Sequence, residues 1–287
     1  MAETIELTYT LDEYKSDEKP TWCPGCGDFG VLNALYNAMR EKKYNPKDVV
    51  LVSGIGCSSR LPFFVSTYGF HGVHGRAMPI ATGVKVARPE LNVLVLGGDG
   101  DAFAIGGGHF MHAARRNLNL TYVIMDNQTY GLTKGQASPT AQVGYVTKAA
   151  PKGTVEAPVN PLLLAMACGA SFVARGFSGQ PKDLAQLILA GIEHNGLAII
   201  DTYSPCPTFN RVNTFKSYRE EVAPLPAGHD RHDFEAALRI ASSQEPRYLG
   251  VIYQREGPSY DQLLEERKSG TQADLPQLLD SLFARCS

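Results

Sequence analysis

Five short apolar runs alternate with stretches of helical character, and this alternation constrains the fold of the chain more than any other feature. The runs are rich in Val and Ile and are Val49 to Ser53, Val93 to Leu96, Thr121 to Met125, Ser171 to Ala174 and Leu197 to Ile200. The predicted helices are Phe29 to Lys43, Arg76 to Ala87, Ile105 to Arg116, Pro161 to Ala167 and Pro181 to His194. Strands that alternate with helices predict an α/β fold, with a doubly wound and mostly parallel sheet covered on both faces.

A change in composition near residue 220 divides the chain into two predicted regions. Residues 1–220 hold all five apolar runs, and a chain of 287 residues is long enough for a large core that needs no disulfides. Beyond Arg219 the chain is rich in Pro, Gly and Ala at Ala223 to Gly228, and then charged and amphipathic at Asp233 to Ser243 and Tyr260 to Lys268. Residues 221–287 are therefore predicted to form a linker and a charged helical tail.

Charge and hydropathy exclude several classes of protein. Lys and Arg number 27 against 29 Asp and Glu, whereas a dedicated nucleic-acid binder usually carries a basic excess. The longest apolar stretches are far shorter than the roughly 18 residues that a membrane span requires. Met1 to Lys19 lacks the basic-then-apolar layout of a secretory signal. We expect a cytoplasmic protein with no nucleic-acid partner and no membrane contact.

Four chemically distinctive residues follow predicted strands. Cys57 comes after the first run, Asp99 after the second, Asn127 after the third and Cys206 after the fifth. In doubly wound sheets, ligands bind beyond the carboxyl ends of the strands. The sequence therefore predicts that these four side chains lie along one edge of the sheet.

Two of these strand ends have the composition of a diphosphate and metal site. The first reads Gly97-Gly98-Asp99-Gly100-Asp101, and the second reads Asp126-Asn127-Gln128-Thr129, with 26 residues between Gly100 and Asn127. Glycines let backbone N–H groups approach an anion, and a helix N-terminus favours phosphate. A carboxylate and an amide oxygen suit Mg²⁺ shared with phosphate groups. We expect a diphosphate bridged by Mg²⁺, and the alternative is that Gly-Asp-Gly is only a turn.

The cysteines suggest a second inorganic site. Cys23-Pro24-Gly25-Cys26 is a C-x-x-C in a tight turn, and it is compatible with zinc, with iron or with a redox disulfide. Cys57 and Cys206 lie on Gly- or Pro-bounded loops and are best placed to complete a set of four ligands. The spacing leaves zinc and an iron-sulfur cluster equally open. Cys168, in an apolar helix, is interpreted as a packing residue and Cys286 as a terminal thiol.

Taken together, the motifs resemble the β subunit of a 2-oxoacid:ferredoxin oxidoreductase, a thiamine diphosphate enzyme. The motifs, in order between Thr21 and Cys206, are Cys-Pro-Gly-Cys, Gly-Ile-Gly-Cys, His-Gly-Arg-Ala, Gly-Gly-Asp-Gly-Asp and Asn-Gln-Thr-Tyr-Gly-Leu-Thr-Lys-Gly-Gln. The resemblance implies the diphosphate-binding fold of thiamine enzymes. It also implies one [4Fe-4S] cluster, held by Cys23, Cys26, Cys57 and Cys206.

The same resemblance implies roles for the residues of the diphosphate site. Mg²⁺ is expected to be bound by Asp99, by the Asn127 side chain and by the Thr129 carbonyl. The residues expected to line or contact the diphosphate are His74, Gly75, Gly98, Gly100 and Asp101. Of these, His74 is expected to donate a hydrogen bond to a diphosphate oxygen.

The implied reaction is oxidative decarboxylation of a 2-oxoacid, with coenzyme A as acyl acceptor and ferredoxin as electron acceptor. The chain is too short to contain the pyrimidine-binding domain of thiamine enzymes as well, so the active site is expected to be completed by a separate α subunit. Arg60 and Lys134 are candidate partners for a distal carboxylate, which favours 2-oxoglutarate over pyruvate or a branched-chain 2-oxoacid. Leu132 is a candidate for the apolar wall of the same pocket.

Two alternatives to this function stay open at the level of sequence. One is a non-catalytic scaffold subunit whose fold is stabilised by a bound zinc ion, and in which Gly-Asp-Gly is a turn. The other is an electron-independent thiamine decarboxylase or a relative of acetohydroxyacid synthase, which shares the diphosphate site but does not need four converging cysteines.

Overall fold

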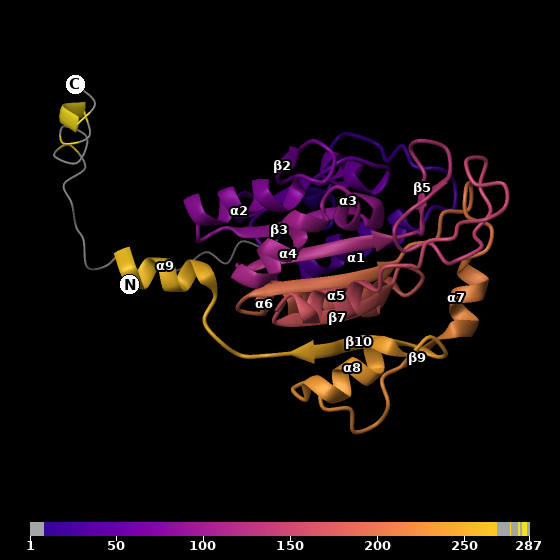
Figure 1. The fold of residues 1–287 in the computed structure, drawn as a ribbon. Coiled ribbons are helices and arrows are strands. Elements are labelled where there is room, and N and C mark those ends of the chain that lie inside the picture. Colours follow the sequence, from indigo (N-terminus) through magenta and orange to yellow (C-terminus); the bar gives the residue numbers. More distant parts are fainter. Residues whose placement is uncertain (1–8, 269–275, 277–280, 282, 286–287) are drawn as a thin grey trace.

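An eight-stranded sheet runs through the molecule in the order β2-β1-β3-β4-β8-β7-β10-β9 (Figure 1). The structure is a computed structural model that describes residues 9–268, 276, 281 and 283–285. Neighbours from β2 to β7 are parallel, β10 is antiparallel to β7, and β9 is parallel to β10. The strands of this sheet are β1 Val49–Ser53, β2 Tyr68–His71, β3 Asn92–Gly98, β4 Leu120–Asp126, β7 Phe172–Phe177, β8 Leu197–Tyr203, β9 Val222–Pro224 and β10 Arg247–Gln254.

The five predicted strands form the centre of this sheet. Every residue of β1, β4, β7 and β8 is buried, as the continuous apolar runs of a parallel sheet with two covered faces require. The sequence does not predict β2, in which all four residues are exposed at the edge of the sheet. A short antiparallel pair, β5 Thr129–Tyr130 and β6 Gln136–Ala137, follows β4. The mostly parallel, doubly wound α/β class is confirmed.

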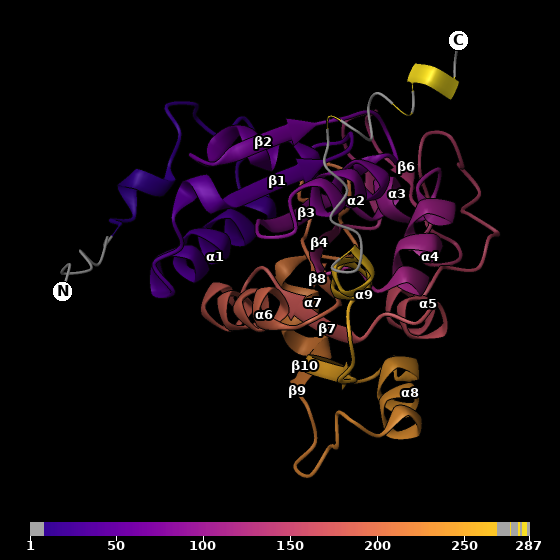
Figure 2. The same ribbon diagram turned by 90° about the vertical axis from the view of Figure 1, so that its left-hand side faces the viewer.

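Helices cover both faces of the sheet (Figure 2). One face packs against α1 and α6, and the other packs against α2, α4, α5 and α8. The α-helices are α1 Asp28–Glu41, α2 Ala77–Ala87, α3 Asp99–Phe103, α4 Gly107–Arg116, α5 Pro161–Ala167, α6 Pro181–Glu193, α7 Phe215–Glu221, α8 Phe234–Ser242 and α9 Tyr260–Lys268. In the part of the chain that the structure describes, no helix is both long and apolar enough to cross a bilayer.

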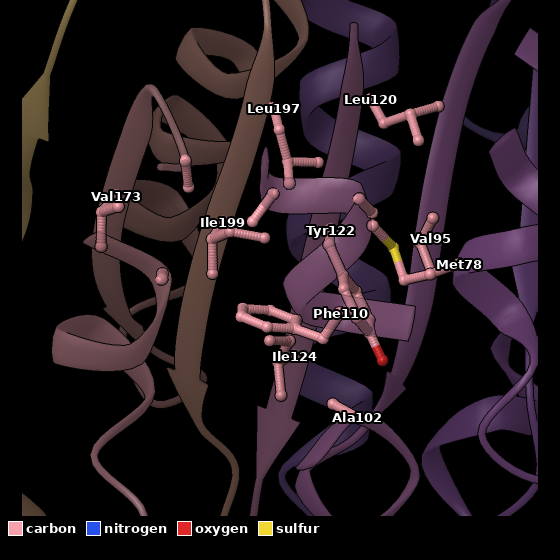
Figure 3. Close-up of a cluster of buried hydrophobic side chains, with 14 of the residues drawn as sticks. Met78, Val95, Ala102, Phe110, Leu120, Tyr122, Ile124, Val173, Leu197 and Ile199 are labelled. Atoms are coloured by element: carbon pink, nitrogen blue, oxygen red, sulfur yellow. The ribbon is translucent and has the colours of Figure 1, made fainter. Parts of the chain in front are cut away.

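Aromatic and aliphatic side chains fill the core between the sheet and α4. Phe110, on α4, is fully buried beside Tyr122 and Ile124 of β4 (Figure 3). Its ring meets Phe103 edge-on, with ring centroids 5.2 Å apart. This packing holds α3 and α4 against the carboxyl half of the sheet, and so positions the Gly-Asp-Gly segment that opens α3.

Residues 221–268 contribute strands to the sheet as well as the helices that the sequence predicts. The predicted helical segments appear as α8 and α9, whereas β10 pairs with β7 through Gly250 and Arg175 and through Val251 and Ala174. Ile252 is fully buried and belongs to the same core cluster as the central strands. The sequence signal for β10 is weak because most of its residues are only partly buried and Gly250 interrupts it. Cys286 lies outside the described residues.

We expect Ile252→Ala to lower the free energy of unfolding of the whole molecule by about 2–5 kcal/mol, because it opens a cavity in the shared core. Chemical denaturation followed by far-ultraviolet circular dichroism measures the change. The control is Val155→Ala, at a side chain that is 90% exposed, with an expected change within about 0.5 kcal/mol. If Ile252→Ala affected only a separate minor unfolding transition and left the main transition unchanged, β10 would not be part of the shared core.

Candidate active site

The carboxyl ends of β1, β3 and β4 open into a pocket of about 280 Å³. Nine of the residues that the sequence singles out line it: Cys57, His74, Gly98, Asp99, Gly100, Asp101, Asn127, Thr129 and Leu132. A larger cavity of about 470 Å³, between α6 and the β9–β10 end of the sheet, contains none of them. The pocket at the strand ends is therefore the candidate active site.

Asp99, the first residue of α3, is buried and lines the pocket. Its Oδ2 atom accepts hydrogen bonds from the hydroxyls of Ser138 and Thr140, the latter at 2.6 Å. Burial raises the pKa of this carboxyl group. Ser138 and Thr140 lie about 40 residues away in the sequence, where no local signal connects them to Asp99.

A second carboxyl group, on Asp126, shares the Thr140 hydroxyl. The Thr140 Oγ1 atom lies 2.8 Å from Asp126 Oδ1 as well as 2.6 Å from Asp99 Oδ2. One hydroxyl proton serves only one of these contacts, so one carboxyl group must hold a proton. Burial and the neighbouring Asp99 raise the pKa of Asp126 well above its ordinary value, and burial also raises the pKa of Asp99, so the surroundings favour the protonated form of both carboxyl groups.

Asp101 connects three segments of the pocket wall. Its Oδ1 atom accepts hydrogen bonds from the backbone N–H groups of Ile55, at 2.9 Å, and Gly75, at 2.7 Å. The Nδ1 atom of His74 lies 3.0 Å from the same oxygen. This contact fixes the orientation of the imidazole ring, so Nε2 is the ring nitrogen that remains for another partner. Gly75 thus contacts Asp101 and is not among the residues that line the pocket.

The Asn127 segment forms a tight turn at the end of β4. Asn127 Oδ1 accepts a hydrogen bond from the Thr129 backbone N–H at 3.0 Å, and Gln128 between them has φ of 59°. A carbonyl oxygen has two lone pairs, so Asn127 Oδ1 can still bind a cation. Asn127 and Thr129 are both buried at the pocket wall.

Gly100 lies so close to Tyr130 that no other residue fits in its place. A Cβ atom built on Gly100 would lie 2.2 Å from Cε1 of the Tyr130 ring. The ring and the Gly-Asp-Gly backbone therefore form one packed wall, and the glycine is required by close approach.

Three loops bring the cysteines to the same side of the sheet. In the C-x-x-C turn, the Cys26 N–H donates to the Cys23 carbonyl at 3.1 Å. The next residue, Gly27, donates to the Pro205 carbonyl at 2.9 Å, which joins this turn to the Cys206 loop. A Cβ atom on Gly131 would lie 3.3 Å from Cys57 Sγ and 3.9 Å from Cys206 Sγ. The loop that carries Asn127 and Thr129 thus also reaches the sulfur atoms.

Asp28 is a buried carboxylate at the centre of these loops, and sequence reasoning misses it. Its two oxygens accept hydrogen bonds from Ser58 Oγ at 3.1 Å and from Ser204 Oγ at 2.7 Å. These serines lie next to Cys57 and two residues before Cys206, and burial raises the pKa of Asp28 to about 6. Its position two residues after Cys26, at the start of α1, is the signal that could have identified it.

The thiols lie in surroundings that favour their uncharged form. Burial raises the pKa of Cys57 to about 11, and it also raises the pKa values of Cys26 and Cys206. The backbone N–H groups of Phe209, Thr208 and Asn210 oppose this effect at Cys206. In the described residues, no group of three or more His, Cys, Asp or Glu side chains is arranged around a single metal ion.

Of the residues predicted to contact the substrate, one lines the pocket and two do not. Leu132 lines the pocket and is 52% exposed at its mouth. Lys134 lies two residues further along the same loop, is exposed and has φ of 76°. Arg60 is half-buried, its backbone N–H bonds the Cys57 carbonyl at 3.2 Å, and neither cation is among the residues that line the pocket.

Comparisons with known families and proteins agree with this geometry. Residues 54–202 match the family described as thiamine pyrophosphate enzyme, C-terminal TPP binding domain, and residues 206–269 match the C-terminal family of the pyruvate ferredoxin oxidoreductase beta subunit. The 2-oxoacid:ferredoxin oxidoreductase subunit beta of Saccharolobus solfataricus is 44% identical over 261 residues, covering 86% of each chain. The 2-oxoglutarate oxidoreductase subunit KorB of Mycobacterium tuberculosis is 46% identical over 211 residues, covering 74% of this chain and 56% of that one.

A solved structure is similar over nearly the whole length. It is described as the 2-oxoglutarate:ferredoxin oxidoreductase from Magnetococcus marinus with 2-oxoglutarate, coenzyme A and succinyl-CoA bound. The TM-score is 0.91 at 45% sequence identity, and the match covers 95% of each chain.

We expect Gly100→Ala to lower the free energy of unfolding by about 1–3 kcal/mol, because the new methyl group overlaps the Tyr130 ring. In a Tyr130→Ala background the same substitution should cost less than about 1 kcal/mol, and chemical denaturation of all four proteins measures the difference. Gly108→Ala is the control, because nothing lies within 4 Å of the added Cβ. An equal cost of Gly100→Ala in both backgrounds would contradict the contact.

Proposed function

The chain belongs to the β subunits of the 2-oxoacid:ferredoxin oxidoreductases, and from that membership and its pocket we propose that it oxidatively decarboxylates 2-oxoglutarate together with an α subunit. In the proposed reaction, coenzyme A takes the acyl group, CO₂ leaves, and two electrons pass through a [4Fe-4S] cluster to ferredoxin. The observation that carries the proposal is the shared pocket wall, where Cys57 lies with Asp99 and Asn127.

The buried oxygens of the pocket fit a divalent cation and a diphosphate. In the proposal, Asp99, the Asn127 side chain and the Thr129 carbonyl bind Mg²⁺, which compensates the buried charge of Asp99. The backbone of Gly98 and Gly100 approaches the diphosphate, and Asp101 holds the His74 ring toward it. Thiamine diphosphate supplies an electron sink for decarboxylation when bound.

We propose that the cysteine loops hold an iron-sulfur cluster and not a zinc ion. Thiolates around Zn²⁺ lie about 2.3 Å from one centre, and no such arrangement of three ligands exists among the described residues. The four cysteines of a [4Fe-4S] cluster hold a bulkier core, so that their sulfurs lie farther apart. Positive iron would also compensate the thiolates, whose pKa values burial raises at Cys26, Cys57 and Cys206. We propose Cys23 as the fourth ligand.

Exposed apolar side chains surround the mouth of the pocket, where we propose that the α subunit docks. Val73 is 66% exposed beside His74, Ile105 is 54% exposed against the Gly75 backbone, and Leu132 is 52% exposed. The exposed edge strand β2 continues this surface, with Phe70 50% exposed. An apolar rim at the opening of a cofactor pocket is typical of an interface that excludes water.

The proposed choice of 2-oxoglutarate rests on the named relatives and on two cations. The Mycobacterium tuberculosis relative is named for 2-oxoglutarate, and the solved neighbour holds it. Lys134 follows Leu132 and Thr133, which both line the pocket, and its own side chain is exposed. Arg60 is close enough to Cys57 for its positive charge to oppose the burial that raises the pKa of that thiol. Either cation would bind the distal carboxylate, which pyruvate lacks.

Iron analysis tests the cluster directly. Anaerobic purification of the α/β complex should yield a brown protein with about four iron and four sulfide per β chain. Cys57→Ser should lose most of this iron and the ferredoxin-linked activity, whereas Cys168→Ser, at the end of α5, should keep both. A colourless protein with one zinc would identify the scaffold alternative, and full activity of Cys57→Ser would identify an electron-independent decarboxylase.

Substrate preference tests the cations. Lys134→Ala and Arg60→Ala should each be assayed in the complex, and the residue that binds the distal carboxylate should lose about 1.5–3 kcal/mol of transition-state binding. That loss lowers kcat/KM for 2-oxoglutarate by roughly 10- to 150-fold and leaves the residual pyruvate activity unchanged. Lys152→Ala, on another exposed loop, is the control. Unchanged 2-oxoglutarate kinetics in both variants would exclude both assignments.

A further inference from the structure

Asn210 is a fully buried amide that contacts both the cysteine loop and the metal-site loop. Its backbone N–H donates to the Cys206 carbonyl at 2.9 Å. Its side-chain Nδ2 donates to the backbone carbonyl of Asn127 at 3.0 Å. Its Oδ1 accepts the N–H groups of Val212, at 3.1 Å, and Asn213, at 3.0 Å. One residue thus joins a proposed cluster ligand, through its backbone, to a proposed Mg²⁺ ligand, through its side chain.

A second pair of amides runs parallel to this contact. Asn213 Nδ2 donates to Gln128 Oε1 at 2.8 Å, and Gln128 Nε2 donates to the Tyr218 hydroxyl at 3.4 Å. Asn213 and Gln128 are 4% and 5% exposed, so water does not compete for these bonds. Gln128 has positive φ, and its side chain helps to hold the turn that presents Asn127 and Thr129. The two loops are therefore connected by a continuous set of buried amides.

We propose that Asn210 is a positioning residue that couples the two cofactor sites, so that an ordered thiamine diphosphate site stabilises the cluster and an ordered cluster stabilises the diphosphate site. The proposal rests on the proposed function, because it requires both cofactors. The physical basis is linkage: whatever orders residues 127–129 also fixes the Asn127 carbonyl that Asn210 requires, and hence the turn that follows Cys206. The coupling must be equal in both directions.

The position of the contact between Asn210 and Asn127 explains why the two cofactor sites need to be coupled. Electrons must pass from the diphosphate pocket to the cluster, and the segment between Asn127 and Gly131 is the shared wall. A shift of the Cys206 loop relative to this wall changes the distance between the two centres. Asn210 opposes that shift, since its amide and backbone bonds are satisfied only when both loops are in place.

The test is the rate at which an iron chelator removes iron from the α/β complex, with and without thiamine diphosphate and Mg²⁺. In the native complex we expect the cofactor to slow iron loss at least about fivefold, a typical size for coupling between sites. In Asn210→Asp, which keeps the acceptor for Val212 and Asn213 but places a carboxylate against the Asn127 carbonyl, the protection should fall below about twofold. In Asn210→Ala, which removes the side-chain amide, the protection should fall to the same extent.

The matched control is Asn160, whose side chain makes the same pattern of bonds elsewhere. Its Nδ2 donates to the Ala241 carbonyl at 2.9 Å, and its Oδ1 accepts the N–H groups of Leu162 and Leu163. Asn160→Asp and Asn160→Ala should lower stability without changing the protection by cofactor. If Asn210→Ala does not fold, Asn210→Asp decides.

Native-like protection in Asn210→Asp would overturn the proposal, and so would the absence of protection in the native complex. Both outcomes leave the cluster and the diphosphate site intact as assignments. Absence of iron from the native complex would instead overturn the proposed function. The two failures are therefore distinguished by the iron content that is measured before the chelator is added.

Discussion

The parallel pairing of β1, β3, β4 and β8 is the constraint on which the site depends. Ser53 pairs with Leu96, Gly98 with Met125, and Asp126 with Tyr203, so the strands end nearly level with one another. Each strand then leads into a loop with a different chemical group, and these loops share one edge. A slip of one residue in any pair would turn the buried side chains to the opposite face. Because both faces are packed, the register is set by the core and not by the site.

The site places carboxyl groups where water cannot reach them. Asp28, Asp99 and Asp126 are all buried, and burial raises the pKa of each of them. For Asp28, a rise from 3.8 to about 6 corresponds to about 3 kcal/mol of stability lost in keeping it ionised. This figure already includes the hydrogen bonds that Asp28 accepts from Ser58 and Ser204, which lower its pKa, and Thr140 donates to the carboxyl groups of Asp99 and Asp126. The fold therefore stabilises an arrangement that favours cations at the strand ends.

Sequence reasoning identifies the parts of the fold and site that follow from local patterns. Buried apolar runs predict β1, β3, β4, β7 and β8, and the residues that follow them predict the pocket at the sheet edge. Two strands outside the centre of the sheet are missed for a physical reason: β2 is exposed on both sides and β10 is only partly buried, so neither shows a continuous apolar run. The ligand roles of the cysteines and of Asp99 stay predictions.

The supporting residues could not be predicted, because their partners are distant in sequence. Thr140 contacts Asp99 across 41 positions, Ser204 contacts Asp28 across 176, and Asn210 contacts Asn127 across 83. Ser, Thr and Asn are common in loops, so none of these residues stands out from its neighbours. Only the folded chain shows which of them are buried.

The loop from Asn127 to Gly135 explains why these supporting contacts are concentrated in one place. Its first residues line the pocket, its Tyr130 ring packs on Gly100, and Gly131 lies against the sulfurs of Cys57 and Cys206. A Cβ atom at position 131 would make a tight contact with Cys57 Sγ, at 3.3 Å, and a shift of Tyr130 would open the Gly-Asp-Gly wall. The loop must therefore be held at both ends, by the Asn127 turn with Asn210 at one end and by the Thr129–Ala137 pairing at the other. The separation between the two proposed cofactors is consequently a property of this loop and its buried amide contacts.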